Sequence, residues 1–272
     1  MSRFPSLLAL VLLAPGGALA RAEAVLEVSG SVVSVAPRLE VRLVLKNRGD
    51  RAAAPLEITA ELFGERREAR LAEGVAPGGE GALVLAFAPE GARPGTHALT
   101  LLLEHPIEGA PDAGGNPPLA SRRAWLLLAF GPSPREPVRL SSDPLTVDVR
   151  GGLAVRLESA DGEPHRVLLR ALAARGLRVD GGPVEVPVPA RGAASITVPI
   201  VRAGAARGSR HGVLLVAESV DGALARTAVA AAPVDIAPDP SLLPRLRTAV
   251  WLLGGLFVAL ALGGEGCRSL RA

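Results

Sequence analysis

Apolar and polar residues alternate with a period of two along much of this chain. From residue 39 to residue 46, every odd-numbered position is apolar, whereas Glu40, Arg42 and Lys46 are charged. Such alternation is typical of a strand with one buried and one exposed face. Similar runs rich in Val, Leu and Ile recur between residues 25 and 236, separated by turns rich in Gly, Pro and Asp. The pattern predicts an all-β fold of antiparallel strands.

These runs define thirteen expected strands, which fall into two groups. The first group comprises residues 25–34, 38–47, 56–64, 81–88, 96–104 and 121–130. The second group comprises residues 144–150, 153–159, 165–172, 183–188, 193–200, 211–219 and 223–232. Six or seven strands in about 105 residues are typical of an Ig-like sandwich.

Three of these segments recur in the same order after a shift of about 114 positions, which indicates duplication of a whole domain. The segments 39–43, 83–87 and 97–104 match 153–157, 196–200 and 211–218. We therefore predict two tandem Ig-like antiparallel β-sandwiches, at residues 25–131 and 138–236. The Pro-rich segment Gly131–Pro137 between them is expected to be a stiff hinge.

The first twenty residues have the organisation of a signal peptide. Arg3 supplies a positive charge, Leu7–Leu13 is a short apolar run, and Ala18 and Ala20 form a small-residue cleavage site. Residues 1–20 are therefore expected to direct export.

The chain has a second apolar segment, residues 248–264, which carries no charge and is predicted to be one C-terminal transmembrane helix. At about 1.5 Å per residue, the run from Ala249 covers about 24 Å of the roughly 30 Å bilayer core, so the helix is expected to start earlier, where Ser241 can cap it. Residues 237–247 would form a Pro-rich stalk and residues 265–272 a short cytoplasmic tail. The expected membrane-anchoring residues are Arg245, Arg247, Trp251, Arg268 and Arg271. The alternatives are a helix buried in a partner and a processed sorting signal.

Composition favours a bacterial envelope protein over a eukaryotic receptor. The only cysteine is Cys267, so the predicted ectodomain contains no disulfide, and neither Asn47 nor Asn116 lies in a glycosylation sequon. The net charge is +3 and the basic residues are scattered, so no patch for nucleic acid is evident.

Turn motifs in the first copy resemble those of bacterial Ig-like modules of the CARDB type. These motifs are Val44–Asp50, which contains Asn-Arg-Gly, together with Val75–Gly78 and Pro94–Thr96. The second copy is similar to Ig-like modules of bacterial surface proteins at Val188–Gly192, but has Ser159–Gly162 where the Asn turn would be. The resemblance implies the sandwich fold, an extracytoplasmic location and a role in adhesion, spacing or assembly, without catalytic residues.

A long connection in the first copy is the best candidate for contact with a partner. Residues 105–120 have no counterpart in the second copy, which has only a short turn at Asp221–Gly222. Loops longer than about 12–15 residues are uncommon unless they are functional or disordered. The candidate contact residues are His105, Pro106, Ile107, Glu108, Asp112 and Asn116. The alternative is a mobile insertion without a partner.

Other chemical signals have structural explanations. In each of the pairs His97/Glu104 and His211/Glu218, the two residues are seven positions apart. Because seven is odd, the two side chains of a pair within one strand point to opposite faces of the sheet. The tripeptide Arg48–Asp50 matches an adhesion motif but also fits a turn. No motif for a nucleophile, metal or phosphate is present, so we expect no enzyme activity, no cofactor and no metal. Four aromatic residues fall within expected strands, so we expect them to pack in the core and not to bind a glycan: Phe63, Phe87, Trp125 and Phe130.

Taken together, the sequence predicts a non-catalytic, membrane-anchored protein with an extracytoplasmic ectodomain. It would act as a scaffold or accessory subunit for another envelope protein or complex. Its expected partners are the bilayer and an envelope protein, with no nucleic acid and no small-molecule substrate. The alternative function is a surface adhesion or glycan-binding module.

Overall fold

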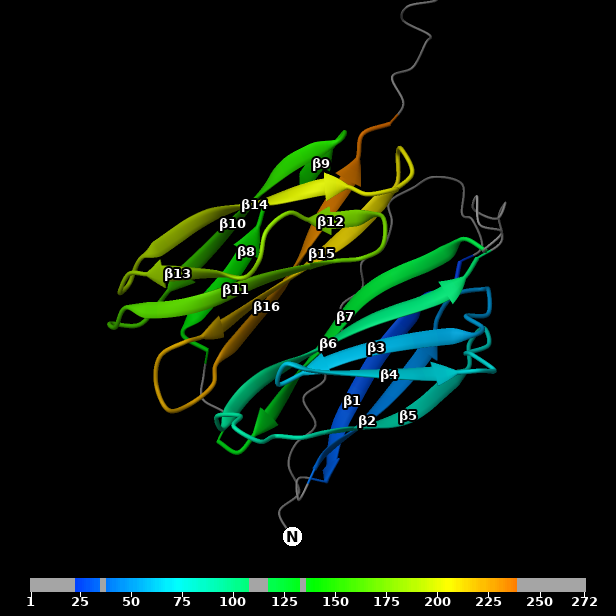
Figure 1. Ribbon diagram of the computed structural model, residues 1–272, viewed down its shortest axis with the longest axis horizontal. Coiled ribbons are helices and arrows are strands. Elements are labelled where there is room, and N and C mark those ends of the chain that lie inside the picture. The colour runs from blue at the N-terminus through cyan, green and yellow to red at the C-terminus, as the bar shows by residue number, and fades with distance from the viewer. Residues whose placement is uncertain (1–22, 35–37, 108–116, 133–135, 239–272) are drawn as a thin grey trace, which may run out of the picture. The chain divides into compact units, whose positions relative to one another are not determined.

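Strands pair into four sheets in the computed structural model, which describes residues 23–34, 38–107, 117–132 and 136–238 (Figure 1). The expected signal peptide, the membrane helix and its five anchoring residues lie outside these ranges, as does the middle of the Pro-rich hinge. Within the described ranges there is no helix with the length and apolar character needed to cross a membrane. The described strands belong to one compact unit that ends at Ile236.

Two of the sheets form the first sandwich. Their strands are β1 (Leu26–Ser34), β2 (Leu39–Asn47), β3 (Leu56–Leu62), β4 (Glu65–Leu71), β5 (Glu80–Phe87), β6 (Gly95–Pro106) and β7 (Leu119–Phe130). One sheet has the order β1-β2-β5 and the other the order β4-β3-β6-β7. In Figure 1 the second of these sheets crosses in front of β1 and β2. This arrangement is that of an Ig-like sandwich.

The other two sheets form the second sandwich. Its strands are β8 (Val138–Ser142), β9 (Leu145–Val147), β10 (Arg150–Ser159), β11 (His165–Ala173), β12 (Leu177–Val179), β13 (Val184–Val188), β14 (Ala193–Arg202), β15 (Arg210–Ser219) and β16 (Thr227–Ile236). The sheet orders are β12-β14-β10-β8 and β13-β11-β15-β16-β9. The short strand β9 runs parallel to β16, whereas the other ladders are antiparallel.

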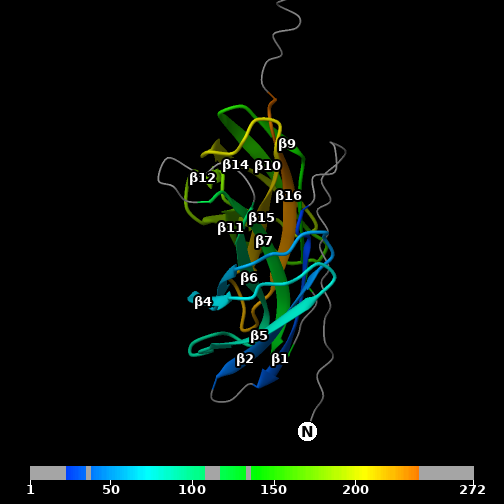
Figure 2. The same ribbon diagram turned by 90° about the vertical axis from the view of Figure 1, so that its right-hand side faces the viewer.

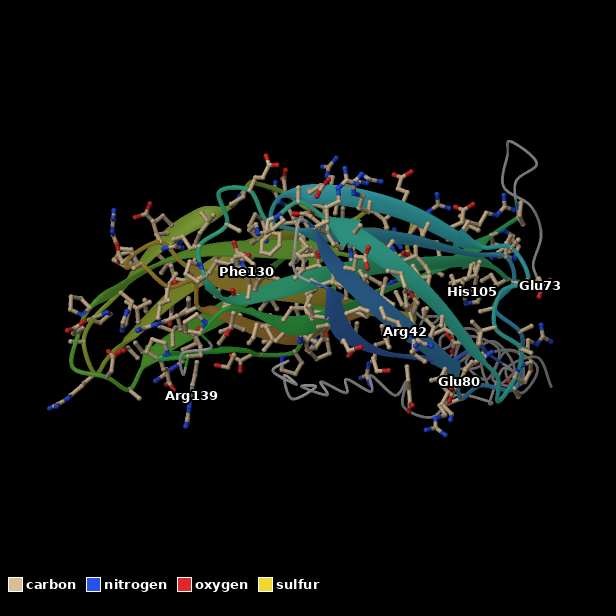
Figure 3. All side chains as sticks on the ribbon, turned by 90° about the horizontal axis from the view of Figure 1, so that it is seen from below. Arg42, Glu73, Glu80, His105, Phe130 and Arg139 are labelled. Carbon is tan, nitrogen blue, oxygen red and sulfur yellow. The ribbon has the colours of Figure 1, made fainter. Side chains whose placement is uncertain are left out.

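Each sandwich is filled by the inward positions that the alternating pattern predicts. Leu39, Val41, Leu43 and Leu45 of β2 are all at most 1% exposed, and Phe87 of β5 is fully buried in the same core. On the outer side of this sheet, Arg42 and Glu80 are exposed (Figure 3). The all-β prediction is confirmed. The repeat also has a structural counterpart, because the matched segments are β2 and β10, β5 and β14, and β6 and β15. Strand β5 pairs with β2 as β14 pairs with β10, and β6 and β15 are both inner strands of the opposite sheet.

Some strand boundaries were predicted wrongly. Phe63 was expected in a strand, but Phe63 (φ 55°) and Gly64 (φ 75°) form the tight turn that joins β3 to β4. Strand β4 was missed because its sequence, ERREARL, is charged and lies at a sheet edge, where no side chain needs to be apolar. Strand β12 was missed because it has only three residues, and β8 was also missed. Strand β16 starts four residues later than expected, at Thr227.

Candidate functional site

The long connection proposed as the contact loop is shorter than expected, because its ends belong to strands. His105 pairs with Ala120 and Pro106 with Leu119, so β6 and β7 continue to the end of this hairpin. The backbone N–H of Ile107 donates to the carbonyl of Pro118 at 2.9 Å.

The candidate residues of this loop therefore differ in their surroundings. His105 is buried, with 6% exposure, and its Nδ1 lies 3.0 Å from the Pro106 carbonyl oxygen. Ile107 is 42% exposed at the base of the loop. Glu108, Asp112 and Asn116 lie outside the described residues. The prediction that His105 and Pro106 are loop residues was wrong, since the β6–β7 ladder includes both.

The two repeated His/Glu pairs do not form a shared site. His97 stacks edge-on against Phe63 with ring centroids 4.7 Å apart, and its Nε2 lies 2.8 Å from the Arg93 carbonyl oxygen. Glu104 instead lies 3.7 Å from Nε of Arg175. In the second copy, Ser209 Oγ lies 2.8 Å from Nε2 of His211, and burial lowers the pKa of that histidine. Each pair is thus divided between separate contacts.

The Asn-x-Gly turn that carries the family resemblance is built around a fully buried side chain, Asn47. Its Oδ1 accepts hydrogen bonds from the N–H groups of Gly49 (2.9 Å) and Val25 (3.2 Å). Its Nδ2 donates to the carbonyls of Arg51 (2.6 Å) and Val75 (3.0 Å). One amide group therefore connects the turn to the start of β1 and to the loop before β5.

The adjoining Arg48–Asp50 tripeptide is occupied by contacts within the fold. Nε of Arg48 donates to Glu27 at 2.9 Å, and Oδ1 of Asp50 accepts the N–H of Glu23 at 2.8 Å. Gly49 packs so closely that an added Cβ would lie 1.9 Å from the Glu23 carbonyl oxygen. These contacts support the interpretation of the motif as a turn.

In the second copy the equivalent turn, after β10, is stabilised by different residues. The N–H of Ser159 donates to the Gly192 carbonyl at 2.8 Å, as the N–H of Asn47 does to the Gly79 carbonyl. Here Oδ1 of Asp161 accepts from Ser159 Oγ (3.1 Å) and the imidazole of His165 (2.8 Å). The hydrogen bond from His165 lowers the pKa of Asp161.

The largest feature that the sequence did not predict is an apolar contact between the two sandwiches, here called the junction. Strands β6 and β7 meet β15 and β16 there, and these strands are neighbours in both views (Figures 1 and 2). Its apolar residues are Ala98, Trp125, Leu127, Leu172, Leu214, Val216 and Val229. Trp125 was expected in a core, but it faces this junction instead.

Backbone pairing crosses the junction at Gly95, which has a φ of 138°. The N–H of Ala225 donates to the Pro94 carbonyl (2.7 Å), and the N–H of Thr96 donates to the Ala225 carbonyl (2.9 Å). The Thr227 hydroxyl donates to the Thr96 carbonyl at 2.8 Å. A Cβ on Gly95 would lie 2.0 Å from the Ala225 carbonyl oxygen, so only glycine permits this approach.

Arg93 binds the turn of the second sandwich that follows β15. Its Nη1 donates to the carbonyls of Val220 (3.2 Å), Asp221 (3.3 Å) and Gly222 (2.9 Å), and its Nη2 donates to the carbonyl of Ser219. A guanidinium group suits this role because its several N–H groups are held in a fixed plane.

A charged cluster lies beside the apolar part of the junction. Arg170 of β11 contacts Glu61 of β3 at 2.7 Å and Glu218 of β15 at 2.9 Å. Burial acts to lower the pKa of Arg170, but the attraction of Glu218 and of Glu61 outweighs it and the pKa is raised. Nearby, Nε of Arg123 donates to the Ala173 carbonyl at 3.0 Å, and burial lowers the pKa of Arg123.

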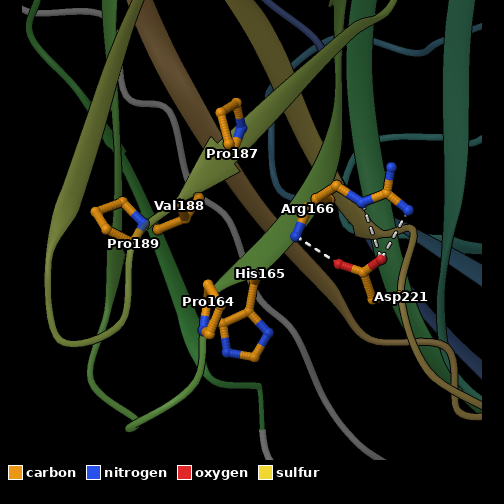
Figure 4. A pocket seen from close by; sticks show the side chains of 7 residues that line it. All are labelled: Pro164, His165, Arg166, Pro187, Val188, Pro189 and Asp221. Atoms are coloured by element: carbon orange, nitrogen blue, oxygen red, sulfur yellow. Dashed lines mark hydrogen bonds and ion pairs between the residues drawn. The ribbon is translucent and has the colours of Figure 1, made fainter.

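A shallow apolar hollow of about 540 Å³ lies on the second sandwich (Figure 4). Three prolines, Val188, His165, Arg166 and Asp221 line it. Asp221 accepts from Arg166 at 3.1 Å and holds the pKa of that guanidinium above its usual value, and Glu185 lies 3.0 Å from it. The charged groups around this hollow are therefore already paired. In the described part of the chain, His, Cys, Asp and Glu form no group of three or more that could hold a metal ion.

Comparisons with known proteins give only distant likenesses. No family model and no curated protein matches the chain. An α2-macroglobulin mutant from Salmonella has a TM-score of 0.32 and 10% identity, covering 78% of this chain but only 16% of that one. A protein of unknown function from Porphyromonas gingivalis W83 has a TM-score of 0.32 and 12% identity, covering 78% of this chain and 99% of that one. Red sea bream transglutaminase has a TM-score of 0.27 and 14% identity, covering 78% of this chain and 31% of that one. No activity or partner follows from scores at this level.

Proposed function

We propose that this chain is a non-catalytic envelope protein whose two tandem Ig-like sandwiches form an extracytoplasmic scaffold or accessory subunit. The signal peptide exports it, and the C-terminal helix of residues 248–264 anchors it in a membrane. The observation that carries the proposal is the junction. Apolar packing, backbone hydrogen bonds and partly buried arginines would hold the two sandwiches together, which suits a scaffold better than a flexible tether does.

Further support comes from the way polar groups are used. The histidines and carboxylates of the two repeated His/Glu pairs each contact another residue of the fold, as do Arg166 and Asp221 at the hollow of Figure 4. An assembly role needs surfaces rather than a reactive group, and the loop after Ile107 is our candidate for the surface that contacts a partner.

The proposed location can be tested with a topology reporter. A reporter that is active only outside the cytoplasm, fused after Ala237, should be active, because the signal peptide would carry residues 21–237 across the membrane. The matched control lacks residues 1–20 and should be inactive. Activity of a cytosol-specific reporter at the same fusion point would contradict the proposed export.

The proposed partner role can be tested by purification from gently solubilised membranes. Replacing residues 108–118 by Asn-Gly-Thr should close the β6–β7 hairpin with a two-residue turn, because Thr supplies the closing N–H that Pro118 lacks. Recovery of a stoichiometric protein partner should fall by about tenfold or more. Thermal stability should stay near wild type, since the N–H of Ile107, which now donates to the Pro118 carbonyl, can donate to the carbonyl of the residue that replaces Pro118.

A matched control for this experiment is Arg139→Ala, which changes an exposed side chain of β8 and should leave recovery unchanged. Equal recovery of the partner with the loop variant would remove the loop from the proposal. A chain that retains a glycan and no protein would favour the alternative adhesion function.

A further inference from the structure

Strand β1 has an open side with a regular row of backbone groups. Leu26 lies opposite Asn47, and the N–H of Arg48 donates to the Val25 carbonyl at 2.7 Å. Hydrogen-bonded positions alternate along an antiparallel ladder, so, counting from Val25, residues 25, 27, 29 and 31 form the backbone hydrogen bonds to β2. The N–H and C=O groups of residues 26, 28, 30 and 32 therefore point away from β2. Among the described strands, none pairs with this side of β1.

Other sheet edges carry features that oppose pairing with another chain. Strand β4 is charged, and β13 contains Pro187. The open side of β5 is covered, because Nε of Arg67 donates to the Ala86 carbonyl (3.1 Å) and Glu65 accepts the N–H of Ala88 (2.8 Å). Strands β9 and β12 have three residues each, and β7 and β8 carry arginines. Strand β1 has no proline and a single charged residue, Glu27.

The sequence of β1 is also suited to pairing with itself. Residues 28–32 read Val-Ser-Gly-Ser-Val, the same in both directions. If two copies align antiparallel with Gly30 opposite Gly30, then Ser29 faces Ser31 and Val28 faces Val32. The hydrogen-bonded pairs of this register are formed by residues 28, 30 and 32, the same residues whose backbone groups point outward.

Charge does not oppose this register. Glu27 would lie opposite Val33 of the other copy rather than opposite another carboxylate, and like charges directly opposite each other are destabilising. Val33 is 59% exposed and has no partner on β2, where the register shifts between Val32 and Ser34. This bulge ends the regular edge, so residues 28–32 are the part that pairs in this register.

We propose that the chain forms a two-fold dimer in which the β1 strands of two copies pair antiparallel about Gly30. The two three-stranded β1-β2-β5 sheets would then form one continuous sheet of six strands (3 + 3). The same surface of each copy forms the contact, as a two-fold interface requires. This proposal depends on neither the export nor the anchoring proposed above.

Cysteine cross-linking tests the register directly. The full-length chain in detergent carries Cys267→Ser, so that the only thiols are those introduced. Ser29→Cys in one preparation and Ser31→Cys in another, differently tagged, are mixed and oxidised. Residues 29 and 31 face each other as a non-hydrogen-bonded pair, where side chains are closest, so the mixture should form a mixed-tag disulfide dimer. Each variant alone should form several-fold less.

A pair of charge variants provides the second measurement. Ser29→Lys with Ser31→Lys places four lysines around the two-fold axis and should weaken dimerisation by about tenfold or more, as measured by sedimentation equilibrium in density-matched detergent. The matched control is Ala82→Lys with Val84→Lys, since residues 82 and 84 hold the same positions on β5, across β2 from residues 29 and 31. Its dimer affinity should stay within about twofold of wild type.

The outcomes separate clearly. Cross-linking in the mixture that does not exceed the level of either variant alone would overturn the proposal, as would a wild-type chain that stays monomeric. A monomer that gains a strand from another protein would assign the edge to that protein instead. If the lysine variant fails to fold, as judged by circular dichroism, the cysteine experiment decides alone.

Discussion

Gly95→Ala should open the junction while both sandwiches remain folded. The added methyl would lie 2.0 Å from the Ala225 carbonyl oxygen, and a φ of 138° is strained for alanine. Relieving the overlap must break the hydrogen bonds from Ala225 to Pro94 and from Thr96 to Ala225. At a net of about 0.5–1.5 kcal/mol for each of these two hydrogen bonds, the junction should lose about 1–3 kcal/mol.

The fluorescence of Trp125 reports this change. The chain has two tryptophans, so Trp251→Phe leaves Trp125 as the only one. Trp125 is partly buried at the junction, and its emission should shift to longer wavelength when water reaches it. Circular dichroism should still report a β protein, because neither core contains Gly95.

Gly91→Ala is the matched control for this prediction. Gly91 also has a positive φ, 75°, but an added Cβ there meets nothing within 4 Å. It therefore carries the backbone strain without the overlap, and the emission of Trp125 should not change. If the emission spectrum of Trp125 in Gly95→Ala were identical to that of the Trp251→Phe parent, the contact between Gly95 and Ala225 would not be what holds the sandwiches together.

Asn47→Ala should destabilise the first sandwich by at least about 3 kcal/mol of unfolding free energy. The substitution leaves the N–H groups of Val25 and Gly49 and the Arg51 carbonyl without the amide that now satisfies them. Asn47 is fully buried, so water cannot readily replace those bonds. Urea unfolding, followed by circular dichroism, measures the loss.

Asp50→Ala is the control in the same turn. Oδ1 of Asp50 accepts a single exposed hydrogen bond, from the N–H of Glu23, so its loss should cost less than about 1 kcal/mol. Equal unfolding free energies for the two variants would show that the amide of Asn47 has no special weight in the turn.

Much of the fold could be predicted because a half-buried strand must alternate. Strand β2 has four inward apolar residues and an outward face with three charges, and both its bounds and its orientation follow from that pattern. Strand β4 could not be predicted in this way, because no residue of this edge strand is fully buried and only Ala69 and Leu71 on its half-buried face are apolar.

The junction could not be predicted from alternation, but a signal for it was present. In β15, five consecutive residues from Val213 to Ala217 are buried, as are Ala98–Leu101 in β6. Val213–Ala217 is a continuous apolar run, and such runs indicate a strand covered on both faces. The sequence does not say what covers the second face. Arg93 gave no signal either, because an arginine in a turn has no pattern that distinguishes a bound guanidinium from a solvated one.

The contacts made by Arg93 have a consequence for biosynthesis. Arg93 and its carbonyl partners are separated by more than 120 positions in the chain. If the protein crosses the membrane amino-terminus first, β6 and β7 emerge well before the β15–β16 turn exists. During that interval the side chains of Trp125 and Leu127 would be exposed to solvent. A chaperone that binds exposed apolar surface would then be needed until the second sandwich has been translocated.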